Sequence, residues 1–285
     1  MINRLCVIGV GLIGGSLALA LKKAGFCKEV IGAGRNEQRL RKAQELGIID
    51  RYETDYAKAV SAADVVFVAV PLGSMAEVFR KIEPALQDHT LITDGGSAKH
   101  CVVDDAIAIL GNRVKQFIPG HPIAGTEKSG CEAAFESLYQ NRRVILTPLE
   151  QNARKDVDTI RAMWEAAGAE VDEMGARHHD LVLAGTSHLP HLLAYGLVDC
   201  LNQVDDVDEI FRFAAGGFRD FTRIASSDPT MWRDICISNR DAILAMMQRF
   251  QNEMDQLKDA IESEDAEQLL TIFARAKKAR DDFSM

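Results

Sequence analysis

Residues 5–15 decide the fold, and they read L-C-V-I-G-V-G-L-I-G-G. A β-branched apolar run leads into G-x-G-x-x-G, and the Ala- and Leu-rich residues 16–24 are typical of the helix that follows such a turn. In this pattern Gly9 permits the tight turn, Gly11 lets the backbone approach a pyrophosphate, and Gly14 brings the helix close to the strand. We predict a dinucleotide site that uses Gly9, Gly11, Leu12, Ile13 and Gly14, with the phosphates at the positive end of the helix. A plain strand–helix turn is the alternative.

The end of the next predicted strand, residues 29–33, indicates which dinucleotide binds. Folds of this kind that bind NAD usually place Asp or Glu about 20 residues past the last glycine, against the ribose 2′-hydroxyl. That count reaches Gly34, which Arg35 follows, so the carboxylate is missing. A 2′-phosphate would meet no repulsion there, and a guanidinium can bind phosphate through two hydrogen bonds. We therefore predict NADP in preference to NAD, and expect Arg39 and Arg41 on the solvent face of the next helix.

Composition limits the protein class. The 285 residues suffice for two domains with their own cores, and 47% hydrophobic with 26% charged residues is ordinary for a globular protein. No apolar run reaches the ~18–20 residues that span a bilayer, and no targeting peptide precedes the first strand. Six cysteines without C-x-x-C spacing suggest reduced thiols in the cytoplasm, and a net charge of −9 argues against nucleic acid. We expect a soluble cytoplasmic protein with neither a nucleic-acid nor a membrane partner.

Strands and helices alternate over the first 170 or so residues. Residues 64–70 form a continuous apolar run, which is typical of a parallel strand buried on both faces. Further strands are expected at residues 90–94, 117–119 and 143–147. Because a parallel sheet binds ligands outside the carboxyl ends of its strands, three loops should converge: residues 9–15, residues 71–74 with Val70 and Pro71 at the strand end, and residues 95–99.

After Met174 the strand pattern stops, and the remaining residues are typical of helices joined by short polar breaks. We predict an α/β Rossmann-like dinucleotide-binding domain over residues 1–174 and an all-α domain over residues 175–285. One long helix should begin with Asp228 as its cap and carry an apolar seam from Ile243 to Ile261 with alternating spacings of four and three. That seam belongs either to the interior of a small bundle or to a subunit interface, and we expect a homodimer through the helical domain.

Three segments carry candidate chemistry. Residues 119–130 form a loop dense in Gly and Pro, and its one histidine, His121, can exchange a proton beside a nicotinamide. Residues 187–191, S-H-L-P-H, place His191 near the start of a helix at Pro190; a metal site is a weaker alternative, because no further ligand stands at matching spacing. In an acidic chain an anionic substrate needs a local cationic site, and Arg219 and Arg223, on one helical face, are a candidate carboxylate clamp.

Together with D-G-G-S-A-K at residues 94–99, these segments resemble the prephenate/arogenate (cyclohexadienyl) dehydrogenases of tyrosine biosynthesis. H-P-I-A-G-T-E-K-S-G, S-H-L-P-H and G-F-x-D-F-T-R followed by D-P-x-M-W occur in the family's order and span essentially the whole chain. The resemblance suggests the short form of the family, without a fused mutase or a C-terminal regulatory domain.

The resemblance implies a substrate that is a cyclohexadienol with a C4 hydroxyl and a C1 carboxylate. Hydride leaves C4 for the nicotinamide, the hydroxyl proton leaves for a base, and carbon dioxide departs as the ring becomes aromatic. His121 is then the acceptor for the hydroxyl, Ser97 holds the imidazole and hydroxyl in register, and Arg223 binds a carboxylate. The remaining implied residues are His191 near the side chain, Thr126 and Glu127 at the border of the pocket, and Asp220 and Trp232 as supports.

Several alternatives stay open. The family contains enzymes that prefer either cofactor, and prephenate and arogenate differ only in a keto or amino group that no single residue here distinguishes. Inhibition by tyrosine is also open. Competing functions are another two-domain NAD(P)-dependent reductase and a non-catalytic dinucleotide sensor.

Overall fold

The computed structural model describes residues 1–205 and 207–283. They form two compact units, residues 1–240 and residues 241–285. The predicted domain boundary near residue 174 falls inside the first of these units, directly after its last strand, and stays a prediction.

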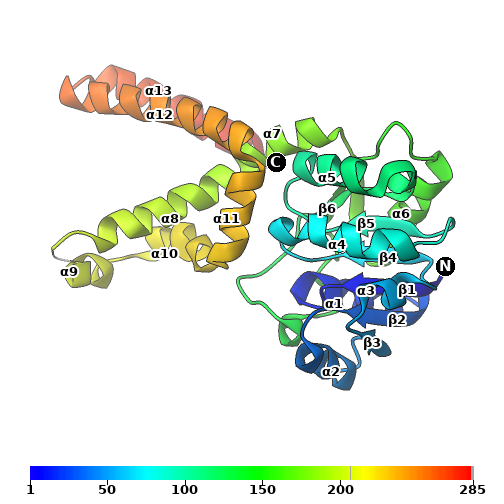
Figure 1. Ribbon diagram of the computed structural model, residues 1–285. Helices are drawn as coiled ribbons and strands as arrows, with labels where there is room; N and C mark the ends of the chain where they lie inside the picture. Colours follow the sequence, from blue (N-terminus) through cyan, green and yellow to red (C-terminus); the bar gives the residue numbers. More distant parts are fainter. Residues whose placement is uncertain (206, 284–285) are drawn as a thin grey trace. The chain divides into compact units, whose positions relative to one another are not determined.

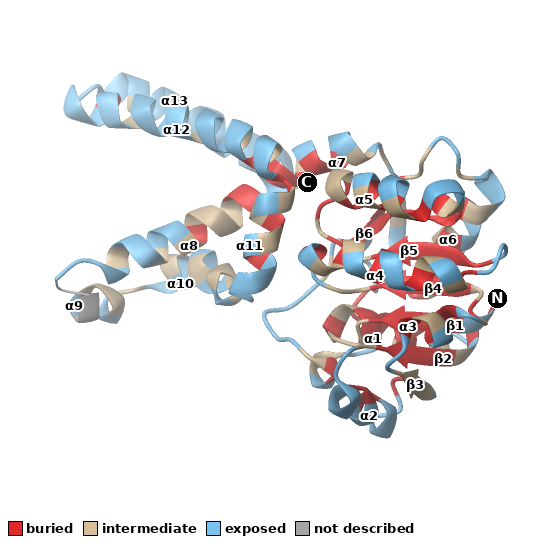
Figure 2. Cartoon of the chain, in the orientation of Figure 1, coloured by how far each residue is buried: buried red, intermediate tan, exposed pale blue. Residues whose placement is uncertain are grey.

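The first unit contains a five-stranded parallel sheet, which confirms the predicted Rossmann-like class (Figure 1). The strand order is β3-β2-β1-β4-β5, with β1 (Ile2–Ile8), β2 (Cys27–Ala33), β3 (Arg51–Glu53), β4 (Val65–Val68) and β5 (Leu91–Asp94). All four residues of β4 are buried, as its continuous apolar run predicts. Figure 2 shows the burial concentrated in this sheet.

Alternate residues of the strands pack against helices on the two faces of the sheet. One face, represented by Phe67, packs on a first group of helices together with the buried Trp164, whose ring meets Phe67 edge-on at 5.4 Å. The other face, represented by Val66 and Val68, packs on a second group. The first group is α1 (Leu12–Lys23) and α6 (Arg154–Ala166), and the second is α3 (Tyr56–Val60), α4 (Met75–Ile82) and α5 (His100–Leu110). This two-sided cover explains the lack of polar residues within β4.

A second, three-stranded sheet corrects the prediction of one continuous sheet. Its order is β6-β7-β8, with β6 (Gly120–Pro122) antiparallel to β7 (Arg143–Leu146) and β7 parallel to β8 (Glu170–Glu173). The strand expected at residues 117–119 is displaced, because Phe117 forms only an isolated bridge to Ile92 and the ladder starts at Gly120. His121 therefore lies on a strand and not in a loop.

The helical part of the first unit begins with a continuous helix over Ala176–Asn202. It consists of α7 (Ala176–Leu183), a π turn (Ala184–His188) and α8 (Leu189–Asn202), and Pro190 lies in the first turn of α8. Within the residues that the structure describes, it is the one helix whose length and mean hydropathy, 1.3 over its most apolar window, would suffice to cross a membrane. From the sequence we expected no such segment, because His188 and His191 interrupt its apolar letters. The side chains of His179, Asp180 and His188 are buried within the first unit.

The predicted long helix after Asp228 is two helices. Asp228 caps α11 (Pro229–Ser238) by accepting hydrogen bonds from the N–H groups of Thr230 and Met231, as predicted. The helix stops at Asn239, and α12 (Arg240–Glu262) follows. The break coincides with a buried Asn239 amide that bonds to other parts of the first unit instead of to solvent.

The remaining helices are α2 (Glu37–Glu45), α9 (Val207–Arg212), α10 (Gly216–Thr222) and α13 (Ala266–Phe283).

The second unit consists of the rest of α12 together with α13, and an ion pair of 3.1 Å between Arg275 and Glu253 links these two helices. Of the predicted seam on α12, Ile243 is buried, whereas Met254 is 46% and Ile261 63% exposed. Much of this seam is therefore uncovered within one chain.

Candidate active site

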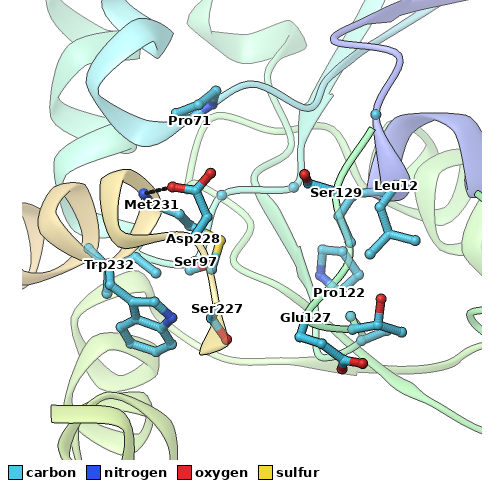
Figure 3. A pocket seen from close by; sticks show the side chains of 18 of the residues that line it. Leu12, Pro71, Ser97, Pro122, Glu127, Ser129, Ser227, Asp228, Met231 and Trp232 are labelled. Atoms are coloured by element: carbon cyan, nitrogen blue, oxygen red, sulfur yellow. Dashed lines mark hydrogen bonds between the residues drawn. The ribbon is translucent and has the colours of Figure 1, made fainter. Parts of the chain in front are cut away.

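A cavity of about 720 Å³ lies in the first unit at the carboxyl ends of β1, β4 and β5. Figure 3 shows Leu12, Pro71, Ser97 and Glu127 around it. The predicted site residues that line it are Gly11, Leu12, Ile13, Val70, Pro71, Ser97, His121, Thr126, Glu127, His191 and Arg223. Residues predicted from four segments of the first 174 residues and from two segments of the helical part thus share one cavity.

The glycine turn has the geometry that a dinucleotide requires. Gly9 has φ +96°, and a Cβ atom there would lie 2.3 Å from the carbonyl oxygen of Ala69. A Cβ on Gly14 would lie 2.3 Å from the carbonyl oxygen of Gly9, so only glycine permits this approach of α1 to the turn. By contrast, the Cβ position of Gly11 has no atom within 4 Å and borders the cavity.

The start of α1 adds an electrostatic argument. The first N–H groups of a helix have no partner within it and carry the positive end of its dipole. No acidic residue occupies the first turn of α1, and Leu12 and Ile13 line the cavity. The turn therefore fits the pyrophosphate of a dinucleotide.

The residues predicted to select the cofactor lie outside the cavity lining. Gly34 follows β2, with the side chain of Leu40 at 3.6 Å from its Cβ position, and Arg35 is exposed. Arg39 and Arg41 lie on the exposed side of α2, where Arg41 pairs with Glu37 at 3.1 Å. The expectation that these two arginines form a solvent face is confirmed.

A buried carboxylate holds two segments of the site in register. Asp94, at the end of β5, accepts hydrogen bonds from the N–H of Gly96 at 2.8 Å and from the N–H of Gly120 at 3.1 Å. The ammonium of Lys99 pairs with the same carboxylate and donates to the Gly120 carbonyl at 2.7 Å. Ser97 and His121 are direct neighbours of these glycines, so Asp94 and Lys99 set the distance between the segments that carry them.

His121 is buried, and its ring is held by a second histidine. Its Nδ1 lies 2.9 Å from Nε2 of His179, and Nδ1 of His179 lies 2.8 Å from Oδ1 of Asp180. Burial, together with the His179 ring and the Lys99 ammonium, holds the pKa of His121 well below that of an ordinary histidine. His121 is therefore neutral near pH 7, as a proton acceptor must be.

Two more histidines border the cavity. His191 donates from Nδ1 to the Ser187 carbonyl at 2.8 Å, which leaves Nε2 as its bare nitrogen in the neutral ring. His188 is 1% exposed, and its Nδ1 lies 3.1 Å from the Asn239 amide nitrogen, which can only donate. Its Nε2 therefore carries the proton, and no hydrogen bond of good geometry satisfies that N–H within the described chain.

Trp232 lines the cavity as well as filling the core. Its ring stacks on His191 at 3.9 Å between centroids and an angle of 23°. The sequence interpretation of this residue as a core support was incomplete, because it borders the ligand space directly. Asp220, expected as a second support, is exposed and does not line the cavity.

Arg223 lies at the cavity, directly after α10, and its side chain is 65% exposed. Its Nη1 is 3.7 Å from Oε2 of Glu127, so these two predicted residues meet. Arg219 is exposed on α10 and does not line the cavity, which corrects the prediction of a two-arginine clamp.

Sequence reasoning missed four residues that form hydrogen bonds around the site: His179, Asp180, His188 and Asn239. The first two lie 58 and 59 residues from His121 along the chain, and Asn239 lies 51 residues from His188. None has a local signal of its own, apart from the position of His188 within the S-H-L-P-H segment.

Comparison with known proteins gives the same assignment along the whole chain. Residues 17–173 match a family model described as "Prephenate dehydrogenase, nucleotide-binding domain", and residues 175–275 match "Prephenate dehydrogenase, dimerization domain". The chain belongs to the prephenate dehydrogenase family. The dinucleotide fold predicted from the glycine turn is thereby confirmed as a nucleotide-binding domain.

Individual members of the prephenate dehydrogenase family are similar to this chain over nearly its whole length. The chain is 39% identical to prephenate dehydrogenase of Bacillus subtilis, over 99% of this chain and 76% of that protein. It is 37% identical to cyclohexadienyl dehydrogenase of Zymomonas mobilis, over 98% of this chain and 95% of that protein. The crystal structure of prephenate dehydrogenase from Aquifex aeolicus in complex with hydroxyphenyl propionate and NAD⁺ superposes with a TM-score of 0.93, at 38% identity over 99% of both chains.

Proposed function

We propose that this protein oxidatively decarboxylates prephenate to 4-hydroxyphenylpyruvate in tyrosine biosynthesis, with a nicotinamide dinucleotide as the hydride acceptor. The observation that carries the proposal is the single cavity that His121, Ser97 and Arg223 share with the glycine turn. A neutral imidazole, a hydroxyl and a guanidinium beside a pyrophosphate site match the three demands of the reaction: a proton acceptor, an orienting group and a carboxylate partner.

A nicotinamide dinucleotide bound at the glycine turn would supply the acceptor for the hydride of C4. His121 accepts the proton of the C4 hydroxyl, and Ser97 orients that hydroxyl against the imidazole. Arg223 binds the ring carboxylate, and it lies in a partly exposed position from which carbon dioxide can leave. His191 lies by the substrate side chain, and Thr126 and Glu127 border the pocket.

For the cofactor, Gly9, Gly11 and Gly14 shape the pyrophosphate site, Leu12 and Ile13 supply helix N–H groups, and Val70 and Pro71 border the nicotinamide side. We further propose that Gly34 and Arg35 give a preference for NADP. Support comes from the exposed Arg35 guanidinium and from the missing acid after β2. Arogenate oxidation to tyrosine is part of the same proposal, because the bare Nε2 of His191 can accept a hydrogen bond from an ammonium.

We also propose a cytoplasmic homodimer through residues 175–285. The support is an apolar surface that one chain leaves uncovered: 28% of the most apolar window of Ala176–Asn202 is buried. Large exposed apolar side chains also occur at Leu197, Phe213, Phe221 and Ile237 in the first unit, and at Leu270 and Phe273 in the second unit. Patches of this kind mark interfaces between subunits.

The experiment is a spectrophotometric assay of cofactor reduction with prephenate or arogenate, each with NADP or NAD. We expect absorbance of the reduced cofactor to rise with prephenate, and faster with NADP than with NAD. Purified His121→Asn is the control, and it should bind the dinucleotide without appreciable turnover. Tight dinucleotide binding by the wild-type protein with no reduction in any of the four mixtures would refute the proposed activity.

A further inference from the structure

We propose that His179 is a positioning residue that, held by Asp180, fixes His121 in the tautomer whose Nε2 is free to take a proton from the substrate. The catalytic consequence rests on the proposed function, whereas the tautomer itself does not.

The Asp180 carboxylate accepts hydrogen bonds from three donors. It accepts from the backbone N–H of Lys99 at 2.8 Å and from that of His100 at 2.9 Å, both at the start of α5. Charged hydrogen bonds to N–H groups at a helix start favour the ionised form, and the contacts with His179, Lys99 and His100 outweigh burial and lower the pKa of Asp180. An ionised carboxylate only accepts, so the 2.8 Å contact with Nδ1 of His179 requires a proton on that nitrogen.

The second step concerns His179, which is fully buried. Burial lowers its pKa below the ordinary histidine value despite the neighbouring carboxylate, so the ring is neutral near pH 7. A neutral imidazole carries one N–H, and in His179 this N–H lies at Nδ1. Its Nε2 is therefore an acceptor.

The third step concerns His121. Because Nε2 of His179 lies 2.9 Å from Nδ1 of His121 and has no proton, Nδ1 of His121 must donate. The opposite tautomer would bring two bare nitrogens together at this distance inside the protein. A buried polar atom without a hydrogen bond is disfavoured, so the structure favours the tautomer in which Nδ1 of His121 donates. The bare nitrogen of His121 is Nε2, the one that does not face His179, in a ring that lines the cavity.

This arrangement supports the proton transfer. A bound nicotinamide would accept the hydride of C4; the O–H bond would break, its electron pair would form the second carbon–oxygen bond, and the proton would form an N–H bond at Nε2 of His121. The imidazolium that results donates from Nδ1 to His179, which donates to the Asp180 carboxylate. These hydrogen bonds orient the imidazolium, while burial, the His179 ring and the Lys99 ammonium keep the pKa of His121 low. Neither His179 nor Asp180 lines the cavity.

The first test is the ring nitrogen NMR spectrum of ¹⁵N-histidine-labelled full-length protein near pH 7, with His121 assigned by its loss in His121→Asn. We expect a protonated Nδ1 and a bare Nε2 for His121 in the wild-type protein. A protonated Nε2 would overturn the proposal. This measurement needs no substrate, so it stands even if prephenate is not oxidised.

The second test compares His179→Leu, His179→Gln and the matched control His178→Leu, whose native side chain is exposed. Leu removes the acceptor, and we expect kcat to fall by roughly 10–10³-fold with KM changed only a few-fold, together with loss of the single Nδ1–H tautomer. The Gln amide can accept from His121 and donate to Asp180, so it should recover much of kcat and restore the tautomer. His178→Leu should resemble the wild type in both readouts.

The outcomes separate the two proposals. Wild-type kcat in a folded His179→Leu, or equal loss in the Leu and Gln variants with the tautomer unchanged, would refute the positioning role. If the NMR spectrum shows the expected tautomer but no substrate is turned over, the proposed function is refuted and the inference about His121 stands.

Discussion

Lys99 forms an ion pair with Asp94 in which both side chains are fully buried. The same ammonium donates to the Gly120 carbonyl, and the same carboxylate accepts from the N–H groups of Gly96 and Gly120. The pair therefore lies behind the cavity and connects the end of β5 with the start of β6. Neither charged group lines the cavity, so the pair acts on the site through the backbone that it holds and through the effect of the Lys99 ammonium on the pKa of His121.

Replacing one member of this pair should destabilise the protein strongly. Lys99→Met leaves a buried carboxylate without its cation, and removal of one partner of a buried pair costs about 3–5 kcal/mol of unfolding free energy. Urea unfolding followed by circular dichroism measures the loss. The matched control is Lys81→Met, which breaks an exposed pair with Glu77 and should change the midpoint little. Equal midpoints for the two variants would contradict this role.

Arg223→Ala tests the carboxylate partner. Loss of a charge-assisted hydrogen bond to the substrate should raise KM by an amount equivalent to about 1.5–3 kcal/mol, with a smaller effect on kcat. Steady-state kinetics with varied prephenate provide the measurement. Arg219→Ala is the matched control, because Arg219 is exposed on the neighbouring helix and does not line the cavity. An unchanged KM in Arg223→Ala would exclude the clamp.

His121→Asn should lower kcat by roughly 10²–10⁴-fold while KM changes little, because the substitution removes the proton acceptor and leaves the carboxylate contacts. The wild-type pH profile gives a second measurement. Protonation inactivates a proton acceptor, and the pKa of His121 is lowered. As acid is added, kcat/KM should therefore stay constant past pH 6.5 and fall only at more acidic pH. A rate that falls already above pH 7 as acid is added would identify a different group, as would a variant within a few-fold of the wild type.

Local signals predicted much of this molecule. The turn at Gly9 and Gly14 could be predicted because its backbone admits only glycine, as the 2.3 Å approaches demonstrate. The buried strand β4 and the cap at Asp228 depend likewise on residues adjacent in the chain. His121, Ser97 and Arg223 were found through motifs, and the structure brings them to one cavity.

The rest depended on packing between distant segments. His179 contacts His121 although 58 positions separate them along the chain, and the sequence around either residue does not predict that contact. The separate sheet that carries His121 arises because β7 pairs antiparallel with β6, a direction that an apolar run does not encode. The break at Asn239 was missed for the same reason, since the amide is drawn to His188 and to the Asp180 carbonyl by tertiary structure.

Gly34→Asp tests the cofactor proposal. A carboxylate after β2 would bind the ribose hydroxyls of NAD and repel the 2′-phosphate of NADP, so the ratio of kcat/KM for NADP to that for NAD should fall at least tenfold. The Cβ position lies 3.6 Å from Leu40, an ordinary contact, so the variant should fold. Gly34→Ala is the steric control. A wild-type enzyme that already prefers NAD would overturn the NADP proposal.

The lowered pKa of His188 predicts how the stability of the folded protein depends on pH. Burial lowers its pKa from the ordinary 6.5 to about 4, so the unfolded chain binds this proton at a higher pH than the folded protein does. Stability is therefore complete above pH 6.5 and declines as the pH falls toward 4, by about 3 kcal/mol for this one group. His121 and His179, whose pKa values are also lowered, act in the same direction.

Urea unfolding between pH 7 and pH 4 measures this decline, and His188→Gln should make it shallower because the glutamine does not titrate. His89→Gln, which replaces an exposed histidine, should leave the slope of the wild type unchanged. A steeper or identical slope in His188→Gln would mean that the ring at position 188 is protonated in the folded protein. It would then carry N–H groups on both nitrogens, and the Asn239 amide would face a donor where the structure requires an acceptor.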